Sequence, residues 1–189
     1  MYRGETGKGD VMSSTRRHPR VVNIDEISPD EQGHGSFGFR RRRLGPEAGG
    51  RAIGCTHFEL APGQTAFPYH FHSAFEEAIY VLEGTGSARV GKDQLEVRAG
   101  DYLAFPAGPE CAHAVTNTGT SPLRYLCVSG AATPTTMDIV GYPDSKKFAF
   151  ASGVDPVKGF RAGSWVAKIV REDSPPVGYY DDEPLAQRK

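Results

Sequence analysis

Turn-forming residues recur at short, even intervals through the middle of the chain. Between Arg51 and Gly130, runs of about five to nine β-favouring residues alternate with turns that contain Gly, Pro or Asn. Short strands separated by turn signals about every 8–12 residues are typical of an antiparallel sandwich or barrel. The pattern therefore predicts an all-β protein built from many short strands.

The composition agrees with this fold class. The 189 residues include 23 Gly and 14 Pro without a period, which excludes collagen and would interrupt the long helices of a bundle. We expect a mobile N-terminal arm over residues 1–19, a β-barrel domain over residues 20–150, and a C-terminal extension over residues 151–189. The extension is expected to pack on the barrel or to be partly disordered. Met137–Val140 and Lys147–Ala151 are candidates for further short strands.

Charge and cysteine content limit the binding partners and the cellular compartment to be expected. The 22 basic and 23 acidic residues leave a formal net charge of −1, which argues against a nucleic-acid partner. Cys55, Cys111 and Cys127 are widely spaced and form no paired motif, as expected in a reducing compartment. The most apolar stretch, Ala78–Leu82, is far too short to span a bilayer. We therefore expect a cytoplasmic protein that binds neither nucleic acid nor membrane.

Two histidines, His70 and His72, stand two positions apart. On a helix they would point to different faces, whereas on a strand they share one face, with Cα atoms about 6.8 Å apart. This spacing predicts a strand and a metal-binding pair together. The following segment, Ala74–Glu83, contains good helix formers, but its Gly-Thr-Gly ending and β-rich flanks favour a strand.

A carboxylate ligand could come from either of two adjacent glutamates. A straight strand continuing from the histidine pair would place Glu76 on the histidine face. A turn at Ser73–Phe75 would reset the phase of the strand. Glu77, Ile79 and Val81 would then line that face instead. The residues alone leave this choice open.

A second segment, Gly100–Asn117, ends one strand at a Pro-x-Gly turn and begins another that carries His113. Together with Gly63–Gly84, it resembles the two signature motifs of the cupin superfamily, and β-rich flanks extend the resemblance to about residues 45–130. The family spacing between the glutamate and the closing glycine favours Glu77. The sequence departs from the pattern in the longer of two family gaps before Glu77 and in four residues, rather than two, between Gly108 and His113.

The resemblance implies a double-stranded β-helix, a small jelly-roll barrel with short helical or irregular flanks, and a divalent metal inside its mouth. It also implies the ligands, which are His70, His72, Glu77 and His113. Imidazole and carboxylate donors suit Fe(II), Mn(II), Ni(II), Co(II) or Zn(II) rather than Ca²⁺ or Mg²⁺. On a six-coordinate ion they leave two positions open for water or substrate. No organic cofactor is expected.

The function that this implies is a metal-dependent enzyme acting on a small oxygenated or acidic metabolite. Dioxygenase or sugar-phosphate isomerase chemistry is favoured, because no separate acid–base pair stands out. No catalytic residue beyond the ligands is assigned. The alternative is a non-enzymatic module that binds or senses a metal and a small molecule.

The sequence gives less specific predictions for several other residues. His57, Tyr80, Tyr102, Arg124 and Tyr125 lie on expected strands, where each side chain faces either the pocket or the opposite side. Cys111 is expected to be a half-buried turn residue, and Asn117 is expected to bond backbone in the barrel wall.

Four consecutive arginines, Arg40–Arg43, would point alternately to both faces of a strand and suit a solvated edge or a subunit contact. A homodimer is expected, because exposed jelly-roll edges pair readily. Residues Val21–Leu44 could supply a partner strand.

Overall fold

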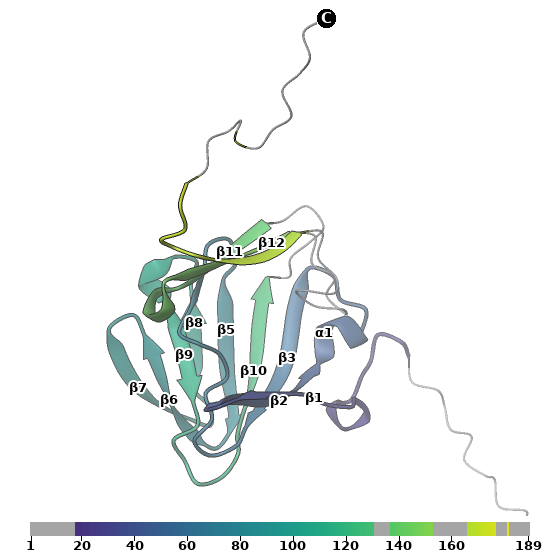
Figure 1. Ribbon diagram of the computed structural model, residues 1–189. Helices are drawn as coiled ribbons and strands as arrows, with labels where there is room; N and C mark the ends of the chain where they lie inside the picture. The colour runs from purple at the N-terminus through teal and green to yellow at the C-terminus, as the bar shows by residue number, and fades with distance from the viewer. Residues whose placement is uncertain (1–17, 131–136, 153–165, 177–180, 182–189) are drawn as a thin grey trace, which may run out of the picture.

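The computed structural model describes residues 18–130, 137–152, 166–176 and 181 (Figure 1). Most of the expected N-terminal arm and much of the C-terminal extension lie outside these residues. The described chain is mostly antiparallel β-structure with one short α-helix, α1 (Leu44–Glu47), and three 3₁₀ turns, η1 (Ile24–Glu26), η2 (Pro109–Cys111) and η3 (Pro143–Ser145). The all-β prediction is confirmed.

Three sheets surround the core. The largest has the strand order β1 (Asp30–His34), β2 (Phe37–Arg43), β3 (Ile53–Leu60), β10 (Leu123–Gly130), β5 (Glu77–Glu83) and β8 (Tyr102–Phe105). A three-stranded sheet of β7 (Asp93–Arg98), β6 (Thr85–Val90) and β9 (His113–Thr116) forms the other side of the barrel (Figure 1). The third sheet lies across the upper end of the barrel in Figure 1 and contains β13 (Val166–Arg171), β12 (Lys147–Ser152), β11 (Met137–Tyr142) and β4 (Phe71–His72).

Alternation along the strands builds the core. On β5, Ile79 and Val81 are buried whereas Tyr80 is exposed, the period-two pattern of a strand with one face on the interior. Leu60 from β3 and Leu123 from β10 are fully buried beside them. The strand predicted for Ala74–Glu83 is therefore confirmed, with its start at Glu77 after an irregular Ser73–Glu76 segment.

The arginine run does not form a sheet edge as predicted. Strand β2 lies between β1 and β3, and β1 is the edge strand. Arg40 bridges Glu31 and Glu59 at 2.7 and 3.0 Å, and Arg41 binds Asp30 at 2.7 Å. Acidic residues of β1 and β3 thus pair with Arg40 and Arg41 across neighbouring strands. Arg42 instead donates to the carbonyl oxygen of Ile27 at 2.9 Å. Residues Val21–Leu44 include strands β1 and β2, which extend the chain's own sheet.

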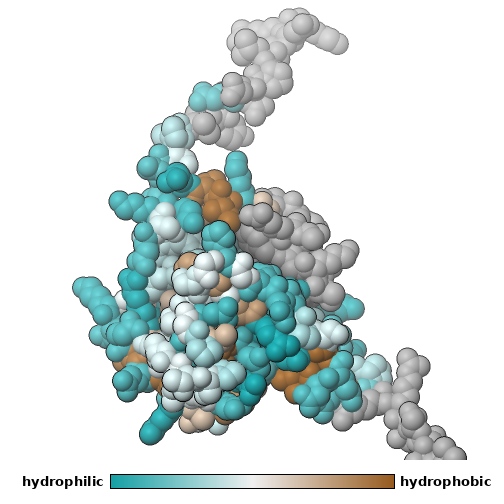
Figure 2. All heavy atoms as spheres, turned by 60° about the horizontal axis from the view of Figure 1, so that its bottom comes forward, coloured by the Kyte–Doolittle hydropathy of each residue, from teal (hydrophilic) through white to brown (hydrophobic). Residues whose placement is uncertain are grey.

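The surface carries scattered rather than continuous apolar patches on the face seen in Figure 2. Within the described residues, no helix is long and apolar enough to cross a membrane.

Candidate metal centre

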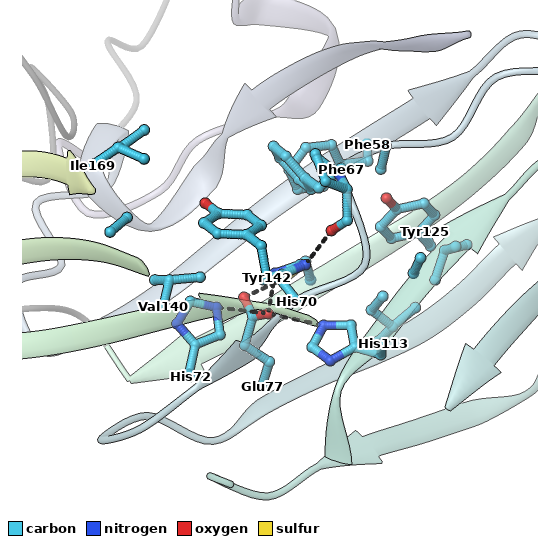
Figure 3. A pocket seen from close by; sticks show the side chains of 17 residues that line it. Phe58, Phe67, His70, His72, Glu77, His113, Tyr125, Val140, Tyr142 and Ile169 are labelled. Atoms are coloured by element: carbon cyan, nitrogen blue, oxygen red, sulfur yellow. Dashed lines mark hydrogen bonds and ion pairs between the residues drawn. The ribbon is translucent and has the colours of Figure 1, made fainter. Parts of the chain in front are cut away.

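The two histidine-bearing segments meet through their backbones. An isolated antiparallel bridge joins His70 to His113, with N–H···O bonds of 3.1 and 2.7 Å in the two directions. His72 follows on β4, and Glu77 begins β5 on the opposite wall. All four side chains converge on one cavity (Figure 3).

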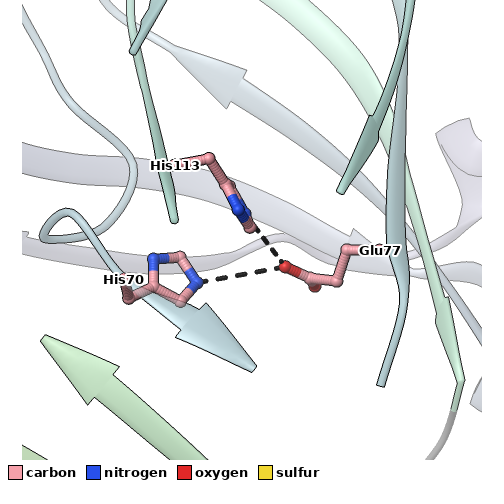
Figure 4. A group of neighbouring side chains, drawn as sticks. All are labelled: His70, Glu77 and His113. Carbon is pink, nitrogen blue, oxygen red and sulfur yellow. Dashed lines mark hydrogen bonds and ion pairs between the residues drawn. The ribbon is translucent and has the colours of Figure 1, made fainter. Parts of the chain in front are cut away.

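The imidazole rings approach a single carboxylate oxygen. Oε2 of Glu77 lies 3.2 Å from Nε2 of His113, 3.3 Å from Nε2 of His72 and 3.9 Å from Nε2 of His70. Ligand atoms of His70, Glu77 and His113 all lie within 4.8 Å of one another (Figure 4). His72 stands outside this compact group of three and approaches Glu77 beside it (Figure 3).

The other nitrogen of each ring is already engaged. Nδ1 of His70 lies 2.8 Å from the carbonyl oxygen of Pro68, and Nδ1 of His113 lies 3.2 Å from that of Cys111. Because a carbonyl can only accept, Nδ1 carries the proton in both rings, which leaves the Nε2 lone pair directed into the cavity.

His72 is held by a carboxylate instead of a carbonyl. Its Nδ1 lies 2.5 Å from Oδ2 of Asp138, a buried residue of β11. The other oxygen, Oδ1, accepts backbone N–H bonds from Ser73 and Ala74, both 3.1 Å long. Asp138 therefore fixes both the His72 ring and the turn that follows it.

Burial and pairing shift the pKa values of His72 and Glu77 in opposite directions. Burial lowers the pKa of His70 to about 4, so this ring is neutral. Burial also acts to lower the pKa of His72, but hydrogen bonds with Asp138 and Glu77 raise it to about 10. Burial would raise the pKa of Glu77, yet the His113 and His72 rings beside its carboxylate hold it well below its ordinary value. The Glu77 carboxylate is therefore anionic, and in the metal-free cluster the protonated His72 ring is its cationic partner.

The donor set fits a divalent transition-metal ion. Ligands about 2.0–2.2 Å from one ion lie about 3.0–3.4 Å from their nearest neighbours, close to the observed separations from Glu77. A divalent ion bound among these ligands would replace the His72 proton as the cation that faces the Glu77 carboxylate. The Nδ1 contacts orient the Nε2 lone pairs, as is usual around protein-bound metals.

The structure separates the two adjacent glutamates. Glu77 faces the histidines, whereas Glu76 is exposed to solvent. The irregular residues after β4 reset the strand phase, which is the alternative that places Glu77 with Ile79 on the inner face. His113 lies deep in the cavity, 5% exposed, despite its longer approach from Gly108.

The remaining candidates divide between cavity and outer face. Tyr125 lines the cavity, whereas Tyr80 and Tyr102 are exposed, and Arg124 binds Glu59 and Glu83. His57 is buried but does not belong to the described cavity lining.

Two further candidates, Asn117 and Cys111, make hydrogen bonds that involve the backbone. Asn117 donates to the carbonyls of Leu60 and Ser121, both at 2.8 Å, as expected for a residue of the barrel wall. Cys111 is half-buried in η2 and contributes its carbonyl rather than its thiol to the site.

Three functional neighbours of the cluster had no signal in the sequence. Asp138 and Tyr142 come from β11, which reaches the site only because it pairs with β4. Sγ of Cys127 lies 3.4 Å from Oε1 of Glu77, on the adjacent strand β10. Burial raises the pKa of the Cys127 thiol well above its ordinary value, so the thiol keeps its proton and donates to the carboxylate.

An apolar cavity of about 330 Å³ opens above the cluster. Four aromatic side chains and a larger number of aliphatic ones line its walls, and β11 and β13 supply part of its rim (Figure 3). The polar ligand cluster therefore lies at one end of a largely apolar space.

Parts of the chain are similar in sequence to known proteins. Residues 56–129 match the family model of the cupin domain. The chain is 38% identical over 60 residues to an uncharacterized protein of Methanocaldococcus jannaschii, a match that covers 32% of this chain and 46% of that protein. It is 29% identical over 106 residues to the tetracenomycin polyketide synthase protein TcmJ of Streptomyces glaucescens, covering 56% of this chain and 67% of the relative.

A solved structure shares the fold over most of the chain. The crystal structure of a candidate sugar phosphate isomerase from Acidithiobacillus ferrooxidans superposes with a TM-score of 0.71 and 24% identity. The superposition covers 84% of this chain and 96% of that one. At 24% identity, the similarity shows a shared fold and not a shared function. Residues 56–129 thus match the cupin domain, and the chain shares its double-stranded β-helix fold with this neighbour.

Proposed function

We propose that the protein is a metal-dependent cupin enzyme acting on a small oxygenated metabolite, with His70, His72, Glu77 and His113 as the metal ligands. One observation carries this proposal. Three imidazole Nε2 atoms lie 3.2 to 3.9 Å from one carboxylate oxygen, while each Nδ1 is engaged by an acceptor outside the cavity.

A bound divalent transition-metal ion supplies Lewis acidity and, where it is redox-active, one-electron chemistry. The chain's own residues orient the ligands. The Pro68 and Cys111 carbonyls and the Asp138 carboxylate hold the rings, and the Cys127 thiol occupies Oε1 of Glu77. Oε2 of Glu77 is thereby left to face the histidines, and the apolar walls above it keep bulk water away.

The reaction type follows from the groups that remain. Apart from the proposed ligands, the titratable residues in the described lining are Tyr125, Cys127 and Tyr142. Burial raises the pKa of each, so all three stay protonated near neutral pH and donate hydrogen bonds rather than accept protons. A pocket without a free base suits oxidoreductase or isomerase chemistry that depends on the metal. The polyketide synthase relative supports a small organic substrate.

Metal analysis joined to an activity screen tests the proposal. Purified wild type should contain stoichiometric metal, and a His70→Ala/His72→Ala variant should lose it. His34→Ala, which changes an exposed histidine on β1, is the matched control and should retain the metal. O₂ uptake or isomerisation on a metabolite panel should follow metal content across the three proteins. Wild type that binds no metal after reconstitution would refute the proposal, and metal binding without turnover would favour a sensing module.

A further inference from the structure

The cavity above the ligand cluster has two chemically different ends. At its floor lie the histidines and Glu77, and the rest of the described lining is almost entirely apolar. A molecule that fills it must therefore present a polar group to the floor and apolar surface to the walls.

Aromatic rings form part of the walls and contact one another. Phe58 stacks on Tyr125, with ring centroids 5.3 Å apart and planes at 19°, and meets Phe67 edge-on at 5.7 Å. Tyr142 lies over His70 at 6.1 Å with planes at 29° (Figure 3). Rings arranged in this way offer both faces and edges to a further flat ring, which is the packing that aromatic groups prefer.

The rim continues the apolar surface. Val140 of β11 and Ile169 of β13 lie beside the opening (Figure 3), and neither offers a hydrogen-bonding side chain. Within the described lining, the positively charged candidates are the histidines of the cluster itself. A phosphate group held against the walls would lose its hydration without a guanidinium or ammonium partner, which disfavours its binding there.

We propose that the pocket takes a flat, aromatic or similarly apolar molecule that carries an oxygen donor at one end, rather than a phosphorylated sugar. The oxygen end faces the ligand cluster, and the ring system lies among Phe58, Phe67 and Tyr142. This assignment rests on the proposed function, because the oxygen donor is directed to the metal end of the cavity.

Calorimetric titration of the zinc-loaded protein tests the assignment, since zinc leaves the probe unoxidised. The probes are 2,3-dihydroxynaphthalene and fructose 6-phosphate. The naphthalenediol should bind at least about tenfold more tightly than the sugar phosphate. Removing the zinc should weaken binding of the diol by a similar factor. Equal or tighter binding of fructose 6-phosphate, or no binding of the diol, would overturn the assignment.

A charge at the rim provides the matched variants. Ile169 is 46% exposed, so Ile169→Glu should fold, and its carboxylate should weaken diol binding by about fivefold or more. Ile169→Leu should bind as wild type does, and Ile169→Gln should show an intermediate loss if the glutamate variant fails to fold. Unchanged diol binding in the polar variants would contradict the placement of the ring. A zinc content near zero in wild type would instead refute the proposed function, which separates the two failures.

Discussion

Asp138 reaches the candidate metal centre from outside both histidine-bearing segments. Its carboxylate holds Nδ1 of His72 at 2.5 Å and accepts two backbone bonds from the following turn. An aspartate at this position increases the basicity of the ring and fixes its orientation toward the cavity.

Asp138→Asn should therefore weaken metal binding by about 10- to 100-fold, the usual loss when the partner of a ligating histidine is changed. The amide keeps the size of the side chain but lacks the charge. Zinc affinity measured by competition with a chelating dye checks this. Asp144→Asn is the control, because Asp144 is exposed and binds Arg89 away from the cavity. Equal zinc affinity in wild type and Asp138→Asn would show that Asp138 does not position the ligand.

Single residues also show how far sequence reasoning extends. The placement of two histidines on one strand face rested on local spacing, whereas the roles of His113 and Glu77 rested on the resemblance to the cupin motifs. The geometry agrees with each placement. The ligand roles themselves stay predictions. Asp138 and Cys127 had no such signal, because pairing between strands distant in sequence brings them to the site.

Gly84 lies in a tight turn between two strands, where the backbone requires a residue without a side chain. It joins β5 to β6 at φ +85°, and a Cβ there would lie 2.5 Å from the Pro122 carbonyl oxygen. Gly84→Ala should destabilise the fold by about 2–4 kcal/mol, because the left-handed backbone cost adds to the clash. Gly63→Ala, at φ +80° but with open space around the new Cβ, should lose only the backbone part, about 1–2 kcal/mol. Chemical denaturation compares the two, and equal losses would contradict the clash.

A charge network ties four strands of the large sheet together. Arg124 on β10 binds Glu59 on β3 at 2.7 Å and Glu83 on β5 at 2.5 Å, and Arg40 on β2 binds Glu59 at 3.0 Å. The hydrogen bond from Arg124 is the main reason that the pKa of Glu59 lies below its ordinary value. A carboxylate with a lowered pKa in the folded state stabilises the fold above its unfolded pKa and loses this effect as pH falls through the folded pKa.

Glu59→Gln should accordingly cost about 1 kcal/mol near pH 7, and that difference from wild type should shrink when the pH is lowered to about 2.5. Urea denaturation of both proteins at the two pH values measures it. Glu96→Gln, an exposed change on β7, should have little effect at either pH. A Glu59→Gln deficit that persists undiminished at the lower pH would mean that the charge of Glu59 is not its source.

Strand identity was the most predictable property of the elements. Strands at Glu77–Glu83, Met137–Tyr142 and Lys147–Ser152 agree with the expected β-segments. The predicted edge position of the arginine strand β2 was wrong, because β1 is the edge strand. The acidic residues of β1 face the arginines only once the β1–β2 hairpin has formed. Local pattern identifies strands, whereas sheet order depends on long-range pairing.

For the whole molecule, the outer face of the large sheet is the candidate subunit contact. Tyr80 and Tyr102 pair directly across β5 and β8, and both are exposed, as are Leu82 and Val128 on the neighbouring positions of that sheet. Exposed apolar side chains gathered on one sheet face are typical of a subunit contact.

We therefore expect a homodimer, measured as a dimeric mass by sedimentation at micromolar concentration. Tyr102→Glu should shift it toward the monomer, because a charge would be buried in the contact. Leu95→Glu, at an exposed position on β7 in another sheet, should leave the mass unchanged. A monomeric wild type, or a Tyr102→Glu protein that remains dimeric, would contradict this contact.

The fold as a whole positions four side chains from three strands and their approaches around one point in an apolar cavity. Anomalous X-ray scattering from crystals of the metal-loaded protein tests this claim most directly. The account predicts one strong peak at the absorption edge of the bound metal, about 2.0–2.3 Å from Nε2 of His70, His72 and His113 and from a carboxylate oxygen of Glu77. A crystal whose cavity shows no such peak, or whose metal lies against other residues, would contradict it.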